Sequence, residues 1–418
     1  MISDRACLAN SAADLPLFGK VVVLVHPAWH SCGSYQVFLS QARAYRALGA
    51  HVLDLAIADM PGSVEGSRHE RAYLAATANL EASRRFYAGM PLHSVFDTGY
   101  FRALNQWLHG NTARSRIETT IRARLPAALT DLPSIDLIHC NHYFCMPAAL
   151  RLRGNSNCPI LLDTHDIQAL QYELSNKTAW LLPPVTSFEE MLDLELAAMR
   201  PATVLIHLND EEAGTFQKLL PQMRHQLLYP TVEPLPSAPG RSDLIIVASA
   251  NYPNFLGVEW FLTEILPKAP GIPVRIIGNI DEEFSRKAPR LRKAHASLFR
   301  GQVRDLGETY RNAGTILLPT KMGHGISIKT VEAMSSGAPL IATSHAFRGM
   351  GLDPAGLANV TLADDSTSFA AAMRRAAANS CTHSDEARSD MRQVYERKFG
   401  FEAYCQALRQ IAVPLVNK

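Results

Sequence analysis

Continuous apolar runs alternate with helical patterns along the first part of the chain. Residues 21–25 are all valine or leucine, which is typical of a strand buried on both faces of a parallel sheet. A helical pattern of apolar positions follows and ends before Gly49, a favourable residue at a helix C-terminus. The next strand is predicted over residues 51–56. Strand, helix and strand in this order predict a βαβ unit.

Residues 62–128 are predicted to be mostly helical, and they are rich in arginine and aromatic residues. Between Arg68 and Arg124 there are nine arginines and four acidic residues, a local excess of 9 − 4 = +5. Two interpretations stay open. Long arginine side chains also cover apolar surface, so the segment can be a solvated helical face over a core. It can also be a docking surface for anionic lipid headgroups or a phosphorylated molecule.

The alternation continues up to a proline-rich segment. Three more strands, each followed by a turn and a helical stretch, are predicted over residues 135–139, 159–163 and 203–208. Residues 230–239 contain four prolines in ten positions, which is typical of a stiff linker. We therefore expect one domain over residues 1–232 and a second over residues 233–418.

The same pattern restarts after the linker. Strands are predicted over residues 244–248, 274–277, 315–318 and 340–343, and helices over residues 254–266 and 326–336. Two successive runs of alternating strands and helices predict an α/β fold with two doubly wound, Rossmann-like domains. Ligands of such domains bind at the carboxyl ends of the strands, so we expect the functional site in a cleft that the two domains face.

Composition excludes several classes of protein. The formal net charge is 41 − 39 = +2, which gives no overall electrostatic reason to bind nucleic acid. Seven scattered cysteines do not form a disulfide framework and fit reduced thiols in a cytoplasm. The first twenty residues lack the apolar stretch of a signal peptide, and no apolar run approaches the roughly 18–20 residues of a membrane span. We expect a soluble, cytoplasmic protein.

The stretch PTKMGHGISIKTVEAMSSGAP, residues 319–339, carries the clearest chemistry. A strand ends in a Gly-x-Gly loop, Gly323 to Gly325, and a helix begins. Glycines let a backbone approach an anion closely, and the free N–H groups at the helix start favour a phosphate. Lys321 and Lys329 flank this point and can neutralise a diphosphate. Glu332 lies one turn beyond Lys329, and its carboxylate can accept hydrogen bonds from a ribose diol.

This stretch closely resembles the signature of family-4 glycosyltransferases of GT-B fold, P-x-R/K-x-G-x-G-x-x-x-K-x-x-E-A-M-x-x-G-x-P. The segments SANYPN at 249–254 and GQVRDL at 301–306 are also similar to elements of that family. The resemblance covers about 110 residues, by the spacing of these elements. It implies retaining transfer of a sugar from a nucleoside diphosphate sugar, with no metal and no other cofactor. It implies that the donor is held by Asn251, Lys321, Gly323, His324, Gly325, Ile326, Lys329 and Glu332.

One position departs from the family pattern. Many members have two glutamates eight positions apart, and His324 stands where the first would be. Some members also lack that first glutamate, so the departure does not exclude activity. Two alternatives therefore stay open: a non-catalytic subunit that binds a sugar nucleotide, and a GT-B-like sugar-nucleotide epimerase.

Two further loops resemble functional loops of the family. His165 and Asp166 follow a strand, and family members often carry His-Asp there, facing the donor sugar. A histidine at the end of such a strand can orient a hydroxyl or relay a proton, so we expect both residues to be catalytic. Gly33 matches a glycine whose backbone faces the acceptor. The histidines and cysteines near residues 26–32 and 139–145 lack zinc-finger spacing, and we expect no metal site.

The resemblance also bears on partners and on the last helix. It implies that the N-terminal domain binds the acceptor, which we expect to be a glycan, a lipid-linked molecule or another anionic molecule. The arginine-rich segment makes a peripheral contact with the inner membrane face one interpretation. The resemblance further implies that a final helix, about residues 401–415, packs back on the N-terminal domain.

Overall fold

The computed structural model describes residues 15–30, 33–177, 179–235, 243–378 and 385–417. The chain divides into two compact units: residues 1–230 with 404–418, called unit 1, and residues 231–403, called unit 2. The predicted domain boundary lay two residues further on, and residues 236–240 of the predicted linker lie outside the described residues. The last helix, α17 (Phe401–Val416), contributes most of its length to unit 1.

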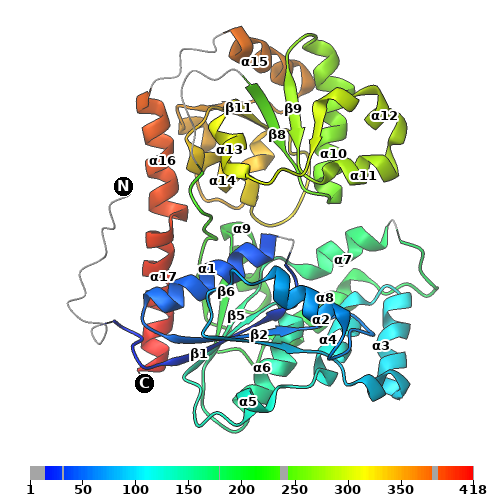
Figure 1. Cartoon of the computed structure of the whole chain (residues 1–418), viewed down its shortest axis with the longest axis vertical. Coiled ribbons are helices and arrows are strands. Elements are labelled where there is room, and N and C mark those ends of the chain that lie inside the picture. Colours follow the sequence, from blue (N-terminus) through cyan, green and yellow to red (C-terminus); the bar gives the residue numbers. More distant parts are fainter. Residues whose placement is uncertain (1–14, 31–32, 178, 236–242, 379–384, 418) are drawn as a thin grey trace. The chain divides into compact units, whose positions relative to one another are not determined.

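Unit 1 is built on a seven-stranded sheet with the order β3-β2-β1-β4-β5-β6-β7, in which neighbouring strands run parallel. The strands are β1 (Val21–Pro27), β2 (His51–Ile57), β3 (Arg84–Ala88), β4 (Leu137–Asn141), β5 (Ile160–Asp163), β6 (Val204–His207) and β7 (His225–Leu227). Besides α17, its helices are α1 (Gly33–Ala47), α2 (Arg68–Ala76), η2 (Leu92–Phe96), α3 (Thr98–Leu108), α4 (Thr112–Arg122), α5 (Ala127–Thr130), η3 (Tyr143–Cys145), α6 (Met146–Arg153), α7 (Gln168–Asn176), α8 (Phe188–Met199) and α9 (Asp210–Leu219). Helices lie on both sides of the sheet (Figure 1).

Unit 2 repeats the plan with six parallel strands in the order β10-β9-β8-β11-β12-β13. The strands are β8 (Asp243–Val247), β9 (Val274–Ile277), β10 (Phe299–Gly301), β11 (Ala313–Leu318), β12 (Leu340–Ala342) and β13 (Val360–Leu362). The helical elements are α10 (Tyr252–Trp260), η4 (Phe261–Ile265), η5 (Leu266–Lys268), α11 (Ile280–Lys287), α12 (Pro289–Ala294), η6 (Ala296–Leu298), α13 (Leu306–Arg311), α14 (Ile328–Ser336), η7 (Ser344–Phe347), η8 (Pro354–Gly356), α15 (Ser366–Ala378) and α16 (Asp385–Phe399). The prediction of two doubly wound domains is confirmed.

The apolar strands explain where the two cores lie. Val22, Val23, Leu24 and Val25 of β1 have no exposed surface, because helices cover both faces of a parallel sheet. Full burial of one such side chain stabilises the fold by about 1.5–3 kcal/mol. Each unit has its own cluster of buried apolar residues.

The strand orders fix where ligands can bind. In each sheet the first strand along the chain has its second and fourth strands as neighbours, so the chain changes direction between β1 and β4 and between β8 and β11. Loops on the two sides of such a switch point run apart and leave a crevice at the carboxyl ends of the strands. The topology therefore predicts ligand-binding sites in the loops after β1 and β4 and in the loops after β8 and β11.

The sequence missed the short strands. The segment 62–128 is not purely helical, because Arg84–Ala88 forms β3 at the edge of the sheet and pairs with β2 alone. An edge strand is only partly buried, so it need not show a continuous apolar run. The strands β7, β10 and β13 have three residues each, too few to show a periodicity.

Two predicted helices end differently in the structure. The helix predicted from residue 326 begins at Ile328, because the Ser327 hydroxyl accepts a hydrogen bond from the Thr330 N–H at 3.4 Å and caps the helix. The helix predicted over 254–266 is α10 followed by a π-helical turn, Phe261–Ile265. None of the helices in the described part of the chain is long and apolar enough to cross a membrane.

Candidate functional site

The glycine loop, defined as residues 319–327, joins β11 to α14 on one side of the switch point of unit 2. Gly323 and Gly325 have φ values of 134° and 69°, a region that residues with a Cβ rarely adopt. A Cβ on Gly323 would also lie 2.9 Å from Nη2 of Arg348. Both predicted glycines are therefore required by backbone geometry, and they bring the chain to the first turn of α14 with its free N–H groups.

Lys329 and Glu332 stand in the first turn and a half of α14, and both are half-buried. Burial lowers the pKa of Lys329 to about 7, with Arg348 acting in the same direction and Glu332 opposing it. Burial raises the pKa of Glu332 to about 7, and Lys329 opposes that shift. Each group lacks enough countercharge in the protein. A bound anion would supply it to Lys329, and a bound diol would supply hydrogen bonds to Glu332.

Arg348 and His345 brace the glycine loop from the segment after β12. Arg348 Nη2 donates to the His324 carbonyl at 3.2 Å, and Nη1 donates to the His345 carbonyl at 3.2 Å. His345 Nε2 in turn lies 3.2 Å from the Gly323 carbonyl, which can only accept its proton. Sequence reasoning missed both residues, because they carry no motif and reach the loop only through the fold.

Other predicted donor residues have different surroundings. Asn251 is exposed and caps α10, since its Oδ1 accepts a hydrogen bond from the Asn254 N–H at 2.9 Å. Lys321 is exposed, and its Nζ lies 4.4 Å from the ring centre of Trp260. His324 is exposed and Ile326 is half-buried. These residues lie in the loops after β8 and β11, so the fold places them on the two sides of the switch point.

The histidine pair, His142 and His165, stands at the carboxyl ends of β4 and β5 in unit 1. Their rings stack with centroids 3.9 Å apart and planes 7° apart, and they are only 1% and 3% exposed. Their φ values are 62° and 58°, and no other described non-glycine residue has a positive φ. Such a backbone typically costs about 1–3 kcal/mol per residue, and strain of this kind gathers at functional sites.

His142 has unused hydrogen-bonding capacity. Among the described residues, neither ring nitrogen of this buried side chain has a partner. Burial, with His165 and Arg116 adding to it, holds the pKa of His142 well below its usual range. The imidazole is therefore neutral, with one N–H and one lone pair that a ligand hydroxyl can satisfy. Sequence reasoning considered His142 only as a metal ligand.

Arg116 lies beside the histidine pair and not in solvent. Its guanidinium carbon is 4.9 Å from the ring centres of Trp29 and Phe144, and its Nη1 is 3.1 Å from Asp59. The Trp29 indole N–H donates to the same Asp59 carboxylate at 3.2 Å. The Trp29 ring packs edge-on against His142, with 4.8 Å between centroids. At least one arginine of the arginine-rich segment is thus part of this site.

His165 is held at both its backbone and its ring. Its N–H donates to Asp163 Oδ1 at 3.2 Å, and its Nε2 lies 2.9 Å from Asn141 Oδ1. Burial lowers the pKa of His165 to about 3 and raises the pKa of Asp163 to about 7. The predicted catalytic histidine is therefore a neutral, firmly positioned group.

Two buried carboxyl groups anchor the loop that carries His165 and half-buried Asp166. The Glu195 oxygens accept the N–H groups of Gln168 and Ala169 at 3.0 and 2.9 Å, at the start of α7. Burial raises the pKa of Glu195 to about 8, and Asp166 adds to the shift. Glu212 accepts from the Ile167 N–H at 3.3 Å. Neither glutamate was predicted, since each sits on a helix distant in sequence.

Gly33, the predicted acceptor contact, is the first residue of α1 and is exposed. Ser31 and Cys32 before it lie outside the described residues. His26, once considered as a metal ligand, bonds instead to Asp54, with 2.6 Å between Nε2 and Oδ1. Within the described ranges no three His, Cys, Asp or Glu side chains gather in a way that could hold a metal ion. The expected lack of a metal stays a prediction.

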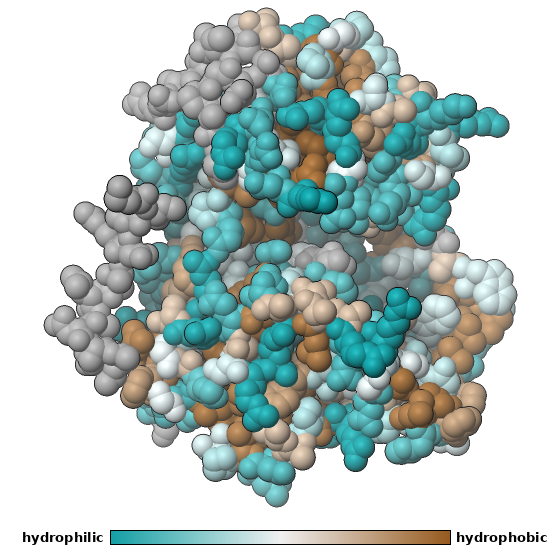
Figure 2. Space-filling model, viewed as in Figure 1, coloured by the Kyte–Doolittle hydropathy of each residue, from teal (hydrophilic) through white to brown (hydrophobic). Residues whose placement is uncertain are grey.

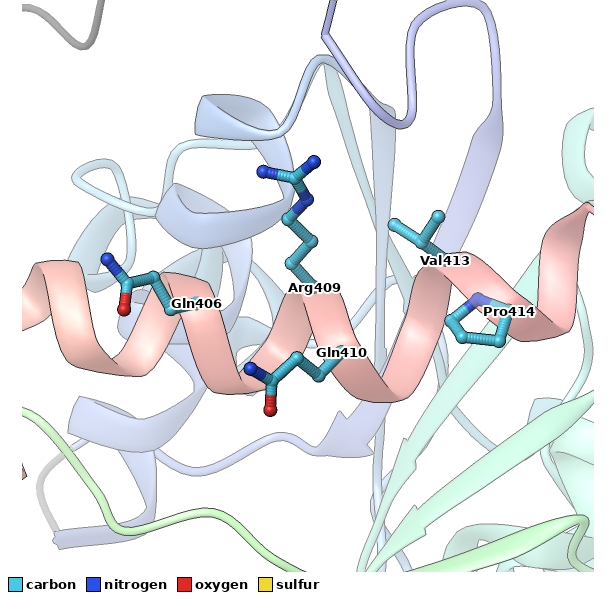
Figure 3. A pocket seen from close by; sticks show the side chains of 5 residues that line it. All are labelled: Gln406, Arg409, Gln410, Val413 and Pro414. Atoms are coloured by element: carbon cyan, nitrogen blue, oxygen red, sulfur yellow. The ribbon is translucent and has the colours of Figure 1, made fainter.

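A separate hollow of about 450 Å³ lies on α17 (Figure 3). The described residues that line it are Gln406, Arg409, Gln410, Val413 and Pro414. It shares no described residue with the glycine loop or the histidine pair. It gives no support to either candidate site.

Comparison with known families finds a match over part of the chain. Residues 241–379 match the family described as "Glycosyl transferases group 1". This range contains the glycine loop, Lys329, Glu332 and Arg348. No curated protein matches the chain.

Solved structures share the fold over nearly the whole chain. Sucrose-phosphate synthase from Thermosynechococcus elongatus superposes with a TM-score of 0.65 at 16% identity, covering 95% of this chain and 99% of that one. HepE from Anabaena in complex with UDP superposes with a TM-score of 0.62 at 13% identity, covering 96% and 100%. TarM from S. aureus, in complex with fondaparinux, α-GlcNAc-glycerol and UDP, superposes with a TM-score of 0.61 at 7% identity, covering 96% of this chain and 100% of that one. The predicted GT-B fold is confirmed by these superpositions, and the residues that match the glycosyl transferases group 1 model lie in unit 2.

The raised pKa of Glu195 predicts how Glu195→Gln changes stability with pH. The unfolded carboxyl ionises near pH 4.5, whereas the folded one stays protonated up to about pH 8. Between these values the wild type therefore loses stability as pH rises, by at most about 1.4 kcal/mol per pH unit from this group. Glu195→Gln lacks this loss, so its stability relative to wild type should rise from pH 5 to 8. Urea unfolding at several pH values measures the difference; a pH-independent difference contradicts the assigned shift.

Proposed function

We propose that this protein is a retaining glycosyltransferase, which moves a sugar from a nucleoside diphosphate sugar to an acceptor hydroxyl without a metal ion. The observation that carries the proposal is the glycine loop at the switch point of unit 2, with Lys329 and Glu332 on α14, inside the range that matches glycosyl transferases. The bound nucleotides of the HepE and TarM structures support a nucleotide sugar as donor.

In this proposal, unit 2 binds the leaving group. The bond between the anomeric carbon and the diphosphate oxygen breaks, and negative charge grows on the diphosphate. The N–H groups of the glycine loop and of the start of α14, with Lys329, stabilise that charge. A diphosphate also raises the pKa of Lys329 back toward its ordinary value, so the lysine binds as a cation. Glu332 accepts hydrogen bonds from the ribose.

Unit 1 supplies polar groups for the sugar and the acceptor. The acceptor oxygen bonds to the anomeric carbon on the face that the diphosphate leaves, and the hydroxyl proton passes to the departing diphosphate. His165 and Asp166 orient the reacting sugar, and Gly33 lies against the acceptor. His142, with its unused ring nitrogens, adds a hydrogen-bonding partner for a hydroxyl. The fold comparisons support this division of labour only through the shared architecture.

The transfer reaction itself tests the proposal. A panel of nucleoside diphosphate sugars is incubated with wild type, and the anomeric configuration of any product is read by NMR. His165→Ala should lower the turnover number about 100-fold or more, the scale of a positioned polar group. His51→Ala, an exposed residue at the amino end of β2, is the matched control and should leave turnover unchanged. If the donor binds but is neither transferred nor hydrolysed, the protein is a non-catalytic subunit. If the donor sugar is isomerised, the protein is an epimerase.

Donor binding gives a second prediction. Glu332→Ala should weaken donor binding by about 1.5–3 kcal/mol, roughly 10- to 150-fold in Kd, because hydrogen bonds to a charged group are lost. Lys329→Ala should weaken nucleoside diphosphate binding much more than nucleoside binding. Lys293→Ala changes an exposed lysine of unit 2 outside the site and serves as the control. If titration calorimetry shows both site variants binding like wild type, the donor site lies elsewhere.

The acceptor class is suggested by an exposed apolar surface on unit 1, here called the α3 surface. It consists of Leu92, Phe96, Phe101, Trp107, Trp180 and Val185. Phe96 and Trp180 are 84% and 80% exposed. The Leu182 N–H donates to the Leu108 carbonyl at 2.9 Å, which ties the segment around Trp180 to the end of α3. Apolar side chains gather where Figure 1 places α3 (Figure 2). Exposed aromatic side chains suit a membrane interface, so we propose a lipid-linked acceptor.

Vesicle flotation tests the α3 surface. Wild type should float with anionic vesicles at low salt, and the double variant Phe101→Ser/Trp107→Ser should bind several-fold less, because two membrane-facing rings are lost. Phe18→Ser changes an equally exposed phenylalanine of unit 1 outside the surface and should float like wild type. Wild type that ignores anionic vesicles at low salt points to a water-soluble glycan acceptor.

A further inference from the structure

A buried amide connects the polar groups around the histidine pair. Gln41 lies on α1 and is fully buried. Its Nε2 donates to Asn141 Oδ1 at 3.0 Å and to Asp163 Oδ2 at 3.1 Å. The same nitrogen lies 3.2 Å from His139 Nε2. One side chain thus meets residues at the ends of two neighbouring strands, β4 and β5.

The direction of these hydrogen bonds is fixed by Asp163. Gln41 and Asn141 bond to each other twice, since Asn141 Nδ2 also donates to Gln41 Oε1 at 2.8 Å. If both amide groups were rotated by about 180°, so that each exchanged its oxygen and its NH₂, the pair would keep both hydrogen bonds. Asp163 removes the ambiguity when it is ionised, at a pH above its pKa of about 7, because a carboxylate only accepts hydrogen bonds. Gln41 must then present its NH₂ to Asp163, and Asn141 must present its oxygen to His165.

We propose that Gln41 and Asn141 are positioning residues that hold His165 with its proton on Nε2 and a lone pair on Nδ1. Asn141 Oδ1 can only accept, so the 2.9 Å contact with His165 Nε2 requires a proton on that nitrogen. A neutral imidazole then has an acceptor at Nδ1, and no residue in the described part of the chain bonds to it.

This inference rests on the proposed function for its chemical meaning. A lone pair at Nδ1 accepts a hydrogen bond from a hydroxyl and repels a phosphate oxygen. His165 is therefore built to meet a hydroxyl of the reacting sugar, and the diphosphate is left to the glycine loop of unit 2. The tautomer itself is a property of the protein alone and can be measured without substrate.

Histidine NMR of the full chain is the direct test. The ¹³C and ¹⁵N shifts of a labelled imidazole distinguish the two neutral tautomers, and the His165 signals are assigned by their loss in His165→Gln. Spectra are recorded near pH 8.5, where Asp163 is ionised, and wild type should show the proton on Nε2. In Asp163→Asn the introduced amide turns its NH₂ toward Gln41. The amide groups of Gln41 and Asn141 then rotate by about 180°, and Asn141 donates its NH₂ to Nε2 of His165. The imidazole proton of His165 should therefore move to Nδ1.

Two further variants complete the test. Gln41→Leu removes the amide that orients Asn141, and the His165 signals should become a mixture of both tautomers. Tyr45→Phe is the matched control: it removes a buried hydrogen bond to His139 Nδ1 from the same layer but leaves the Gln41 amide in place. His165 should stay protonated on Nε2 there. If wild-type His165 carries its proton on Nδ1, the inference is overturned, and this result does not depend on whether any variant folds. An unchanged tautomer in a folded Asp163→Asn variant also overturns it.

Activity then separates this inference from the proposed function. Gln41→Leu should lower the turnover number of transfer about 10-fold while donor Kd stays near the wild-type value, because unit 2 is unaltered. If the NMR results hold and no sugar transfer is found, the tautomer assignment stands and the proposed function fails. If transfer is found and Gln41→Leu turns over like wild type, the positioning role is wrong.

Discussion

Desolvation is the constraint on which both candidate sites depend. The central strands β4 and β5 are fully buried, so the histidine pair at their carboxyl ends has little water around it, and Lys329 and Glu332 on α14 are half-buried. Burial moves the pKa of His165, Glu195, Lys329 and Glu332 toward the neutral form in every case. A buried polar group costs free energy unless it is hydrogen-bonded. That requirement explains why amides, backbone N–H groups and carboxyl groups interlock around the histidine pair.

The two units meet the same constraint with different chemistry. Unit 2 offers backbone N–H groups and a lysine short of countercharge, which suits an anion. Unit 1 offers two neutral imidazoles, which suit hydroxyl groups. Both groups of residues lie at or beside the switch point of their sheet. The same topological feature therefore positions two candidate sites that suit different ligands. The proposed sugar transfer, in which an anionic diphosphate leaves a sugar, would use both.

Local chemistry was readable in the sequence, whereas partners brought together by the fold were not. The valine-rich strand at residues 21–25 and the glycines of the glycine loop follow from rules that act over a few residues. Gln41 lies 100 residues from Asn141, and Arg348 reaches the glycine loop across 24 residues. A glutamine on the apolar side of a helix is the one signal that could have singled out Gln41, and it does not name its partner. Short edge strands such as β3 were missed for the related reason that they bury too little surface to set a pattern.

The positive φ values of His142 and His165 bear on how this chain can be engineered. Glycine adopts that backbone conformation without strain, whereas a histidine there carries a backbone strain of about 1–3 kcal/mol. A glycine at either position would relieve this strain, but it would also remove a buried, stacked ring and leave a cavity. Backbone strain and ring packing therefore have opposite effects on stability at both positions. A thermostable version of this protein should be sought by fixing both histidines first and varying the rest.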